Sequence, residues 1–515
     1  MSLRRYDDGK GVTDNGGNSG TGSGKAQRWR QKVITVNKTK ILFVHHAGQV
    51  IATQPKCPHA GGPLDEGAVC NGRLVCPWHM GTFSLPSGML VEPPAMEGLK
   101  TYPVRVDGQD VFIDLARQSL ASPRPTMSRR SRDKRTFVLV GAGAAGAMAA
   151  TTLRSEGFKG SIVVIDPVKD EPIDRTQLSK QALTDKTPLA KTQLAILEEL
   201  NVKRMKTSII SINSKRRQVR LDTGKLIHFD AALIATGGTP KRLNLPGADH
   251  VYTIRHTEDV RKIRSKATKG SNAVIIGTSF VGLEAASALA QRGVHVTVVG
   301  ETELPFGKQF GQRIARALLA LHKRKGVKFL LGATVVSMSA GKVAAAKDGK
   351  KKSIPADLIL MGVGIAPSLQ FEHDLPIAED GGIEVDESLR AANRVWVAGD
   401  IATVRGRRIE HWRLAQQHGM VAARQMIGSR DNYCGVPFFW TFHFGKRFNY
   451  QGHADEWDTI LYHGSVEKLD FLAFYVKDGR VFAVLSCGKE QETAMLSEMM
   501  RNPLTIRSLH SWLRS

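Results

Sequence analysis

A glycine-rich turn placed directly after an apolar strand is the feature that most constrains how this chain folds. The strand FVLV begins at Phe137, and the turn reads Gly141-Ala-Gly143-Ala-Ala-Gly146. An Ala-rich stretch and a second apolar strand ending at Asp166 follow, so the order predicts a βαβ unit. The glycines would let the backbone approach a pyrophosphate at the helix N-terminus, and the Asp166 carboxylate would accept the ribose hydroxyls. Between a strand and a helix, and followed by its acid, the motif indicates a dinucleotide site.

A second unit of the same kind begins with the strand AVII near residue 273. Ser279 replaces the middle glycine of its turn, which weakens the motif, and an ordinary α/β turn without a nucleotide is the alternative. The acid after the next strand, Glu301, would read a ribose 2′-hydroxyl. Since no arginine stands beside it to hold a 2′-phosphate, NADH is favoured over NADPH. The residues expected at this second site are Gly277, Gly282, Glu284 and Glu301.

Two cysteines and two histidines alternate in the N-terminal part, as Cys57-Pro-His59 and, after sixteen intervening residues, Cys76-Pro-Trp-His79. Thiolates favour an iron–sulfur cluster or zinc, and imidazoles suit both. In zinc fingers with this ligand set, however, the cysteines sit together and the histidines sit together on a helix. Alternating pairs on two loops instead indicate a Rieske [2Fe–2S] centre, where thiolates hold one iron and imidazoles the other. Zinc, or unrelated core cysteines and surface histidines, are the alternatives.

The length of 515 residues predicts about three or four domains. Short strands separated by Gly, Asp and Pro turns predict a small antiparallel β domain before the βαβ region, and aromatic-rich strands with terminal helices predict an α+β domain after it. The predicted divisions are a disordered tail (1–27), the all-β domain (28–116), a basic linker (117–135), a first dinucleotide domain in two parts (136–254 and 376–428) with the second inserted (255–375), and a C-terminal domain (429–515).

Of the formal net charge of +25, +6 lies in the linker, where seven Arg/Lys accompany one Asp, and the rest is spread along the chain. This distribution favours solubility and attraction of anionic partners over nucleic-acid binding. The sequence shows neither an apolar run of about 18 residues nor a secretory signal, so no membrane span is expected. Five scattered cysteines fit a reducing compartment, and a cytoplasmic location is expected. Cys70, Cys434 and Cys487 are expected to be small buried residues.

Segment 50–114 resembles a ferredoxin-type Rieske domain over its full length, with CPHAGGPLDEG, CPWH and EPPAMEGLKTYPVRVDG. Gly62 and Trp78 stand where the respiratory-complex type has two further cysteines. Gly81 and Phe83 stand where that type has a Ser and a Tyr hydroxyl that bond to the cluster. Fewer hydrogen bonds to the sulfurs leave the reduced cluster less stabilised, so we expect a potential of about −150 mV, near the low end of the Rieske range.

Region 136–425 resembles the two-dinucleotide-binding flavoproteins, in which FAD lies on the first unit and NADH on the second. Three further segments carry this resemblance: ATGG from residue 235, VGIAP from residue 363 and VAGD from residue 397. By this resemblance the last carboxylate holds the FAD ribityl chain. The residues it adds to the two sites are Ala235, Thr236, Gly237, Gly364 and Asp400.

The segment PIDRTQLSK, from residue 172, is similar to the Tyr-Asp-Arg-x-x-Leu-Ser-Lys pattern of oxygenase ferredoxin reductases and apoptosis-inducing-factor-like proteins, although Ile173 replaces the usual aromatic residue. The resemblance implies that Arg175 touches FAD and that Lys180 sits near the flavin N5, paired with Glu284. It also places His411 and Trp412 against the isoalloxazine, with Trp440 closing the pocket. The residues expected at the reacting flavin are Lys180, Glu284 and Trp412.

Apart from its tail, the whole chain resembles the Rieske-fused apoptosis-inducing-factor-like flavoproteins. The resemblance implies a multidomain oxidoreductase that passes electrons from NADH through FAD to a [2Fe–2S] cluster, and then to an unknown acceptor such as a ferredoxin, an oxygenase, a quinone or O₂. One alternative is a reductase whose flavin reduces an external ferredoxin directly while the Rieske domain docks or regulates. Another is a redox-sensing signalling protein. Both a monomer and a homodimer are compatible with the sequence.

Overall fold

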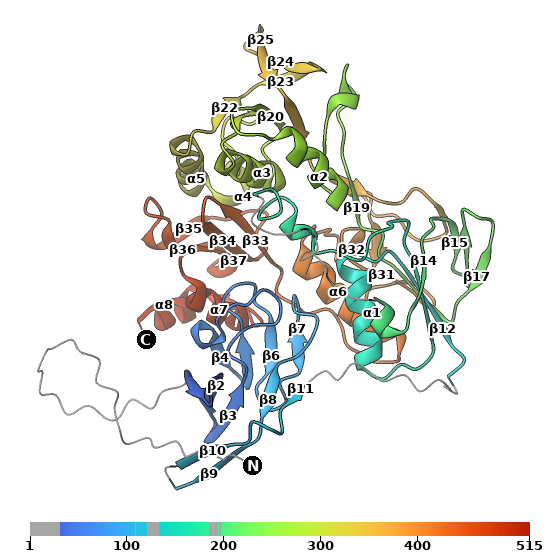
Figure 1. The fold of residues 1–515 in the computed structure, drawn as a ribbon, viewed down its shortest axis with the longest axis vertical. Coiled ribbons are helices and arrows are strands. Elements are labelled where there is room, and N and C mark those ends of the chain that lie inside the picture. Colours follow the sequence, from blue (N-terminus) through green and yellow to red (C-terminus); the bar gives the residue numbers. More distant parts are fainter. Residues whose placement is uncertain are drawn as a thin grey trace, which may run out of the picture. The chain divides into compact units, whose positions relative to one another are not determined.

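The computed structural model describes residues 31–514 except 109, 121–132, 185–188, 190–193 and 195–196. The predicted N-terminal tail and most of the predicted linker lie outside these residues. The chain forms two compact units (Figure 1). The first unit comprises the chain up to Pro123 together with Glu490–Met499, and the second comprises Arg124–Lys489 and Met500–Ser515. Among the described residues, none of the helices combines the length and the apolar character needed to cross a bilayer.

The part of the first unit before residue 121 is an antiparallel all-β domain, as the sequence predicts. One sheet has the order β1-β2-β3-β8-β11, a second has the order β4-β5-β6-β7, and β9 and β10 form a hairpin. The bounds are β1 (Gln31–Val36), β2 (Thr39–His46), β3 (Gln49–Thr53), β4 (Ala68–Cys70), β5 (Arg73–Val75), β6 (Thr82–Ser84), β7 (Leu90–Glu92), β8 (Lys100–Tyr102), β9 (Val104–Asp107), β10 (Asp110–Ile113) and β11 (Ser119–Leu120). The last strand pairs with β8, so the sheet extends past the predicted domain end at residue 116 into the predicted linker.

Strand β2 contributes alternate side chains to the two buried clusters of this domain. Ile41 and Phe43 belong to one buried cluster, whereas Leu42 and Val44 belong to the cluster that also contains the two motif cysteines. Successive side chains of a strand point to opposite faces, which explains this division. The face of β2 with Leu42 and Val44 therefore forms the apolar floor beneath the cysteine loops.

A helix from the C-terminal part of the sequence completes the first unit. This helix, α7 (Glu490–Met499), packs against β4 and buries Ala494 and Leu496 completely. An ion pair joins Arg73 Nη1 to Glu498 Oε2 at 3.3 Å. Sequence analysis assigned these residues to the C-terminal domain, because nothing in a local pattern shows which distant strand a helix covers.

The first dinucleotide domain is a six-stranded sheet with the order β14-β13-β12-β18-β31-β30, parallel except where β30 meets β31. Its strands β12, β18 and β31 are almost wholly buried, as the strands of a covered parallel sheet are. Two distant segments of the chain build it: β12 (Thr136–Val140), β13 (Ser161–Ile165), β14 (Lys203–Met205) and β18 (Ala231–Ile234) come from the first, and β30 (Arg390–Ala392) and β31 (Val395–Val397) from the second.

The second dinucleotide domain has a four-stranded parallel sheet with the order β22-β21-β20-β26 and a three-stranded antiparallel sheet, β23-β24-β25. The bounds are α2 (Thr257–Lys266), β20 (Asn272–Ile276), α3 (Phe280–Gln291), β21 (His295–Gly300), α4 (Gly307–Phe310), α5 (Gln312–Arg324), β22 (Lys328–Leu331), β23 (Thr334–Ser339), β24 (Gly341–Lys347), β25 (Lys350–Ala356) and β26 (Leu358–Met361). Three further short sheets complete this region: β15 (Ile209–Asn213), β16 (Gln218–Leu221) and β17 (Leu226–His228) with β28 (Glu372–His373), β19 (Gly238–Pro240) with β27 (Ile365–Pro367), and β29 (Ile383–Val385) with β32 (Ala402–Val404).

The C-terminal sheet shares a core with the second dinucleotide domain. Leu283 of α3 and Phe310 lie in one buried cluster with Phe448 and Tyr475, and the Tyr475 hydroxyl donates to the Phe310 carbonyl at 3.0 Å. This core fixes β33 beside α3. The sheet has the order β33 (Phe438–His443), β34 (Lys446–Gly452), β37 (Arg480–Cys487), β36 (Asp470–Lys477), β35 (Thr459–Ser465), with β38 (Leu504–Thr505) beside β37 and α8 (Ile506–Arg514) after it.

Helices α1 (Ala144–Ser155) and α6 (Trp412–Met426) lie side by side in the first dinucleotide domain (Figure 1). Gly419 makes their close approach possible, because a Cβ added there would lie 2.1 Å from the Ala145 carbonyl oxygen.

Gly419→Ala is therefore expected to push the helices apart and to lower the free energy of unfolding by about 1–3 kcal/mol, the usual cost of overpacking. Urea unfolding measures this. Gly307→Ala is the control, since its Cβ would meet nothing closer than 3.6 Å, and an equal loss in both variants would contradict the prediction.

Candidate functional site

The two cysteine loops of the first unit have the same backbone hydrogen bonds. In the first loop Cys57 N donates to Gly62 O at 2.9 Å, and Gly61 N donates to Cys57 O at 2.9 Å. In the second loop the corresponding bonds join Cys76 with Gly81 and Met80, at 2.8 and 3.2 Å. Gly61 and Met80, which occupy the same place in each loop, both have positive φ, 75° and 57°. The two loops therefore have the same backbone conformation, and each presents a cysteine first and a histidine two or three residues later.

The four side chains of these loops come together as two pairs. Cys57 and Cys76 are buried, and the hydrogen bond between their thiols, together with burial, raises the pKa of Cys57, while the same bond lowers the pKa of Cys76 to about 7. The His59 and His79 rings are nearly perpendicular, with an interplanar angle of 81°, and their Nδ1 atoms are 3.1 Å apart. Within the described residues no three His, Cys, Asp or Glu side chains converge on one metal position. Two thiols beside two imidazoles are the donor set of a [2Fe–2S] centre with two cysteines and two histidines, so the residues fit this cluster.

The glycines beside this site differ in the room they leave. A Cβ at Gly62 would lie 2.8 Å from Cys76 Sγ, so a side chain there would collide with the thiol pair. A Cβ at Gly81 would lie 3.8 Å from Cys57 Sγ and 3.6 Å from Pro94, which is ordinary contact. Phe83 is fully buried beside the loops and offers no polar atom.

The first glycine turn has the geometry that a dinucleotide needs. Gly141 has φ of 102°, and a Cβ there would lie 2.3 Å from the Ala235 carbonyl oxygen. A Cβ at Gly146 would lie 1.9 Å from the Gly141 carbonyl oxygen. Neither position therefore accepts a side chain. The Asp166 carboxylate accepts a hydrogen bond from Ala142 N at 2.6 Å, so the acid at the end of β13 is held against the turn.

A cavity of about 340 Å³ in the second unit collects most of the predicted cofactor residues. Three buried polar atoms of its lining, Arg175 Nε, His411 Nδ1 and Trp412 Nε1, have no protein partner. Polar atoms buried without partners are costly, so they indicate a polar ligand in this cavity, and FAD fits them. The predicted residues that line it are Gly143, Arg175, Lys180, Ala235, Gly237, Glu284, Gly364, Asp400, His411, Trp412 and Trp440. A small side cavity shares Gly143 and Arg175 and reaches Asp166.

Arg255, which sequence analysis missed, faces the same cavity. Burial raises the pKa of Asp400, and the Arg255 and Arg175 charges oppose that rise. Burial lowers the pKa of Arg175 to about 10 and also lowers that of Arg255. Two half-buried cations that line the same cavity suit an anionic ligand. Arg255 comes just before α2, outside every motif, so no local signal identified it.

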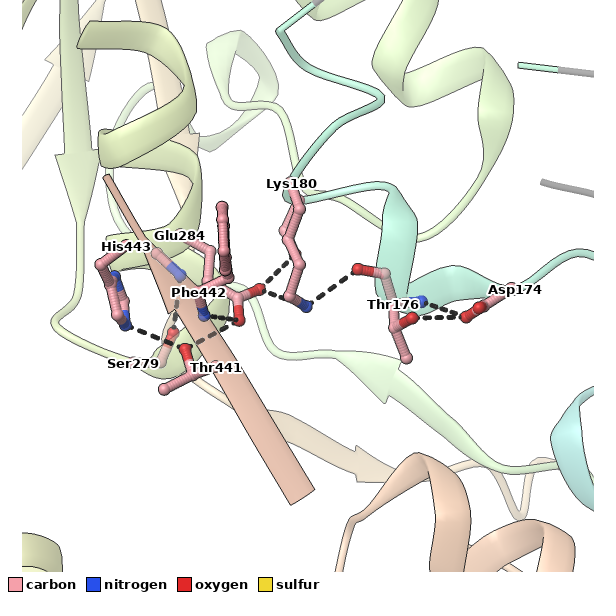
Figure 2. Close-up of polar contacts among 10 residues, drawn as sticks. Asp174, Thr176, Lys180, Ser279, Glu284, Thr441, Phe442 and His443 are labelled. Atoms are coloured by element: carbon pink, nitrogen blue, oxygen red, sulfur yellow. Dashed lines mark hydrogen bonds and ion pairs between the residues drawn. The ribbon is translucent and has the colours of Figure 1, made fainter. Parts of the chain in front are cut away.

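Lys180 and Glu284 form a buried ion pair with Nζ and Oε2 3.0 Å apart (Figure 2). The pairing expected from the sequence is therefore present. Lys180 Nζ also donates to the Thr176 carbonyl oxygen at 2.9 Å and lies 5.9 Å from the centre of the Trp440 ring. The lysine comes from the segment after η2 (Arg175–Gln177), and the glutamate from α3.

The second glycine turn explains the serine that weakened the motif. Ser279 is the N-cap of α3, and its hydroxyl accepts a hydrogen bond from Gly282 N at 3.2 Å. Gly277 has φ of 98°, as the turn requires. The structure does not bring every predicted residue to the cavity. Thr236 donates to the Ser368 carbonyl oxygen, and Glu301 is exposed just after β21. The other predicted residues outside both cavity linings are the turn glycines Gly141, Gly146, Gly277 and Gly282.

The remaining cysteines follow the expectation only at one position. Cys487 is buried as predicted, whereas Cys70 is only half-buried. Cys434 is exposed, so the prediction that it is buried is wrong. It lies between α6 and β33, in a stretch without regular structure that has no core to enter.

Three known domain families match successive parts of the chain. The chain matches the Rieske [2Fe-2S] domain over residues 23–103, the pyridine nucleotide-disulphide oxidoreductase family over 135–419, and the reductase C-terminal domain over 438–508. The confirmed order is a Rieske domain, a reductase domain that binds FAD and a nicotinamide dinucleotide, and a C-terminal domain.

Similar proteins extend over most of the chain. Mouse apoptosis-inducing factor 3 is 31% identical over 491 residues, covering 91% of this chain and 81% of that protein. Rhodocoxin reductase of Rhodococcus erythropolis is 28% identical and covers 69% and 87%. The crystal structure of the covalent putidaredoxin reductase–putidaredoxin complex matches with a TM-score of 0.66 and 26% identity, over 71% of this chain and 93% of that one. The chain therefore belongs to the pyridine nucleotide-disulphide oxidoreductase family, as an oxidoreductase of the ferredoxin-reductase type with its own Rieske domain.

Proposed function

We propose that this protein passes electrons from NADH through FAD to its own Rieske centre, and from there to an external acceptor. The observation that carries the proposal is that one chain contains both the paired cysteines and histidines and the cavity around Lys180 and Glu284. When bound, FAD exchanges two electrons with a nicotinamide and single electrons with an iron–sulfur centre. Sharing one chain raises the effective concentration of the two centres for each other.

The residues of the cavity would have different roles toward the cofactors. Lys180 would place a positive charge beside the flavin, which favours its reduced, anionic form. Trp412 and Trp440 would form apolar walls that exclude water, and Arg175 and Arg255 would hold the anionic part of the cofactor. Glu301 would read the ribose 2′-hydroxyl and favour NADH over NADPH.

The names of relatives support an iron–sulfur acceptor. One relative, from Photorhabdus laumondii, is a dioxygenase ferredoxin–NAD(+) reductase component, 28% identical over 73% of this chain and 99% of that protein. In such systems the acceptor is a separate protein, whereas here a Rieske domain is covalently present. The same names favour the second candidate, in which the flavin reduces an external ferredoxin directly and the Rieske domain docks or regulates. A cytoplasmic location fits both, since Cys57 and Cys76 must stay reduced until a cluster is inserted.

Anaerobic titration with NADH, followed by visible and EPR spectroscopy, tests the proposal. The expected result is bleaching of the flavin followed by a reduced Rieske signal, at a rate no slower than turnover in stopped-flow experiments. The second candidate predicts turnover with a cluster that stays oxidised. An oxidised flavin after excess NADH would contradict both.

The Gly81→Ser variant is expected to raise the potential of the cluster from its low starting value. The structure has room for this side chain, and its hydroxyl would lie near Cys57 Sγ. One added hydrogen bond contributes about 0.5–1.5 kcal/mol, which for one electron is about 20–60 mV. Protein-film voltammetry measures the shift. Gly81→Ala has the same Cβ without the hydroxyl and is expected to leave the potential unchanged, so equal shifts in both variants would contradict the prediction.

A further inference from the structure

A line of buried polar side chains continues from Glu284 on the side away from Lys180. Thr441 Oγ1 donates to Glu284 Oε1 at 2.8 Å and lies 2.9 Å from His443 Nε2. His443 Nδ1 lies 3.1 Å from His322 Nε2 (Figure 2 shows the line as far as His443). Thr441, His443 and His322 are each 0% exposed, and they come from β33 and α5, behind the cavity wall. None of the functions assigned above uses them.

The protons of this line have one consistent arrangement. Glu284 is an anion beside Lys180, so the Thr441 hydroxyl must donate to it. The Thr441 oxygen can then only accept from His443, which places a proton on His443 Nε2. Burial and the Lys180 charge lower the pKa of His443 to about 3 and outweigh a hydrogen bond to the Leu283 backbone that raises it. Burial and the neighbouring His443 lower the pKa of His322 to about 2, so both rings are neutral. His443 Nδ1 therefore accepts from His322 Nε2, and three successive donors point toward Glu284.

The carboxylate of Glu284 is held from two sides as a result. Oε2 receives the Lys180 ammonium and the Ser179 hydroxyl, whereas Oε1 receives Thr441 Oγ1 at 2.8 Å and the Phe442 amide at 3.4 Å. Donors on Oε1 draw negative charge away from Oε2. Lys180 is then less neutralised by its partner, and more of its positive field reaches the cavity that it lines.

We propose that Thr441, backed by His443 and His322, is a positioning residue that sets how strongly Glu284 neutralises Lys180, and thereby how readily the bound flavin takes electrons from NADH. This inference rests on the proposed function, because it assumes that FAD lies beside Lys180. Removing the Thr441 hydroxyl would leave only the long bond from the Phe442 amide on Oε1, so more of the carboxylate charge would fall on Oε2 beside Lys180 and the field that favours the reduced flavin would weaken.

The test compares Thr441→Val with Thr441→Ser and with a matched control in the holoenzyme. Thr403 is also buried, at 1% exposure, and its hydroxyl donates to the Asp380 carboxylate at 2.8 Å, outside the cavity lining. Thr441→Val is expected to shift the equilibrium between NADH and flavin toward oxidised flavin by about tenfold, or about 30 mV for two electrons. Thr441→Ser and Thr403→Val are expected to stay within about twofold of the parent protein. Redox titration of the bound flavin against a reference dye gives the value.

A second variant and a second readout keep the inference open to refutation. His443→Phe leaves Thr441 in place but removes the donor behind it, and should shift the same equilibrium in the same direction by a smaller factor. NMR of ¹⁵N-histidine-labelled protein, with His443→Phe and His322→Phe for assignment, should show two neutral rings protonated on Nε2 that do not titrate between about pH 5 and 9.

The outcomes separate this inference from the function it rests on. If NADH fails to reduce the flavin of the parent protein, the proposed function fails and the inference with it. If the parent protein is reduced normally while Thr441→Val and His443→Phe both behave like Thr403→Val, only the inference is overturned. A ring of His443 protonated on Nδ1 would overturn it as well.

Discussion

The His79→Ala variant is expected to lose electron output from NADH to the external acceptor by at least about 100-fold, while NADH still reduces its flavin. Loss of a direct ligand should cost more than the 10–100-fold that loss of a ligand's supporting partner costs. His79 is buried beside His59, so an exposed side chain cannot take its place as a ligand of the cluster. Steady-state turnover with an iron–sulfur acceptor and stopped-flow flavin reduction measure the two steps separately.

The control for this variant is His46→Ala. His46 lies in β2, opposite Gln49 in the register with β3, and belongs to neither cysteine loop. It should retain the Rieske EPR signal and full output. Unchanged output from a His79→Ala protein that lacks the EPR signal would show that the flavin reduces the acceptor directly.

The Lys180→Met variant is expected to slow reduction of the flavin by NADH by about 100-fold or more. Removing one preorganised donor of charge stabilisation in an active site typically costs 10²–10³ in rate. The same change leaves Glu284 as a buried anion without its cation, and this should lower the free energy of unfolding by about 3–5 kcal/mol. Stopped-flow absorbance and urea unfolding measure the two effects.

The double variant Lys180→Met/Glu284→Gln separates charge at the flavin from stability. A neutral pair has no uncompensated buried charge, so we expect the double variant to recover most of the lost stability. Flavin reduction should remain slow, because the cation is still absent. If the rate recovers together with stability, the role of Lys180 is structural and its charge does not act on the flavin.

Local sequence patterns predicted the sites that are formed by short, contiguous motifs. The glycines at 141 and 146 must lack side chains because backbone atoms lie within 2.3 Å of where a Cβ would be, and this constraint is visible in the sequence. The cysteine loops are similar, because each closes on itself within six residues. The fold class followed from these motifs and from the strand periods.

Contacts between distant segments were beyond such patterns. Arg255 and Thr441 have no motif around them, and their importance comes from the cavity and the ion pair that tertiary packing places beside them. Strands β4, β6 and β7 have three residues each, too few to show a period. Ser279 weakens the glycine motif as a pattern, whereas in the structure its hydroxyl caps the helix that carries Glu284.

The helix that completes the first unit has a consequence for biosynthesis. Residues 490–499 leave the ribosome about 420 residues after β4 (Ala68–Cys70), the strand that they cover. At about 5–20 residues per second, β4 waits about 20–85 s for its helical partner. During that time the apolar surface that Ala494 and Leu496 later cover is open to solvent and to chaperones. The Rieske domain is therefore translated before the reductase domains but completed after most of them, and any cluster loaded before the ribosome releases the chain enters an incomplete fold.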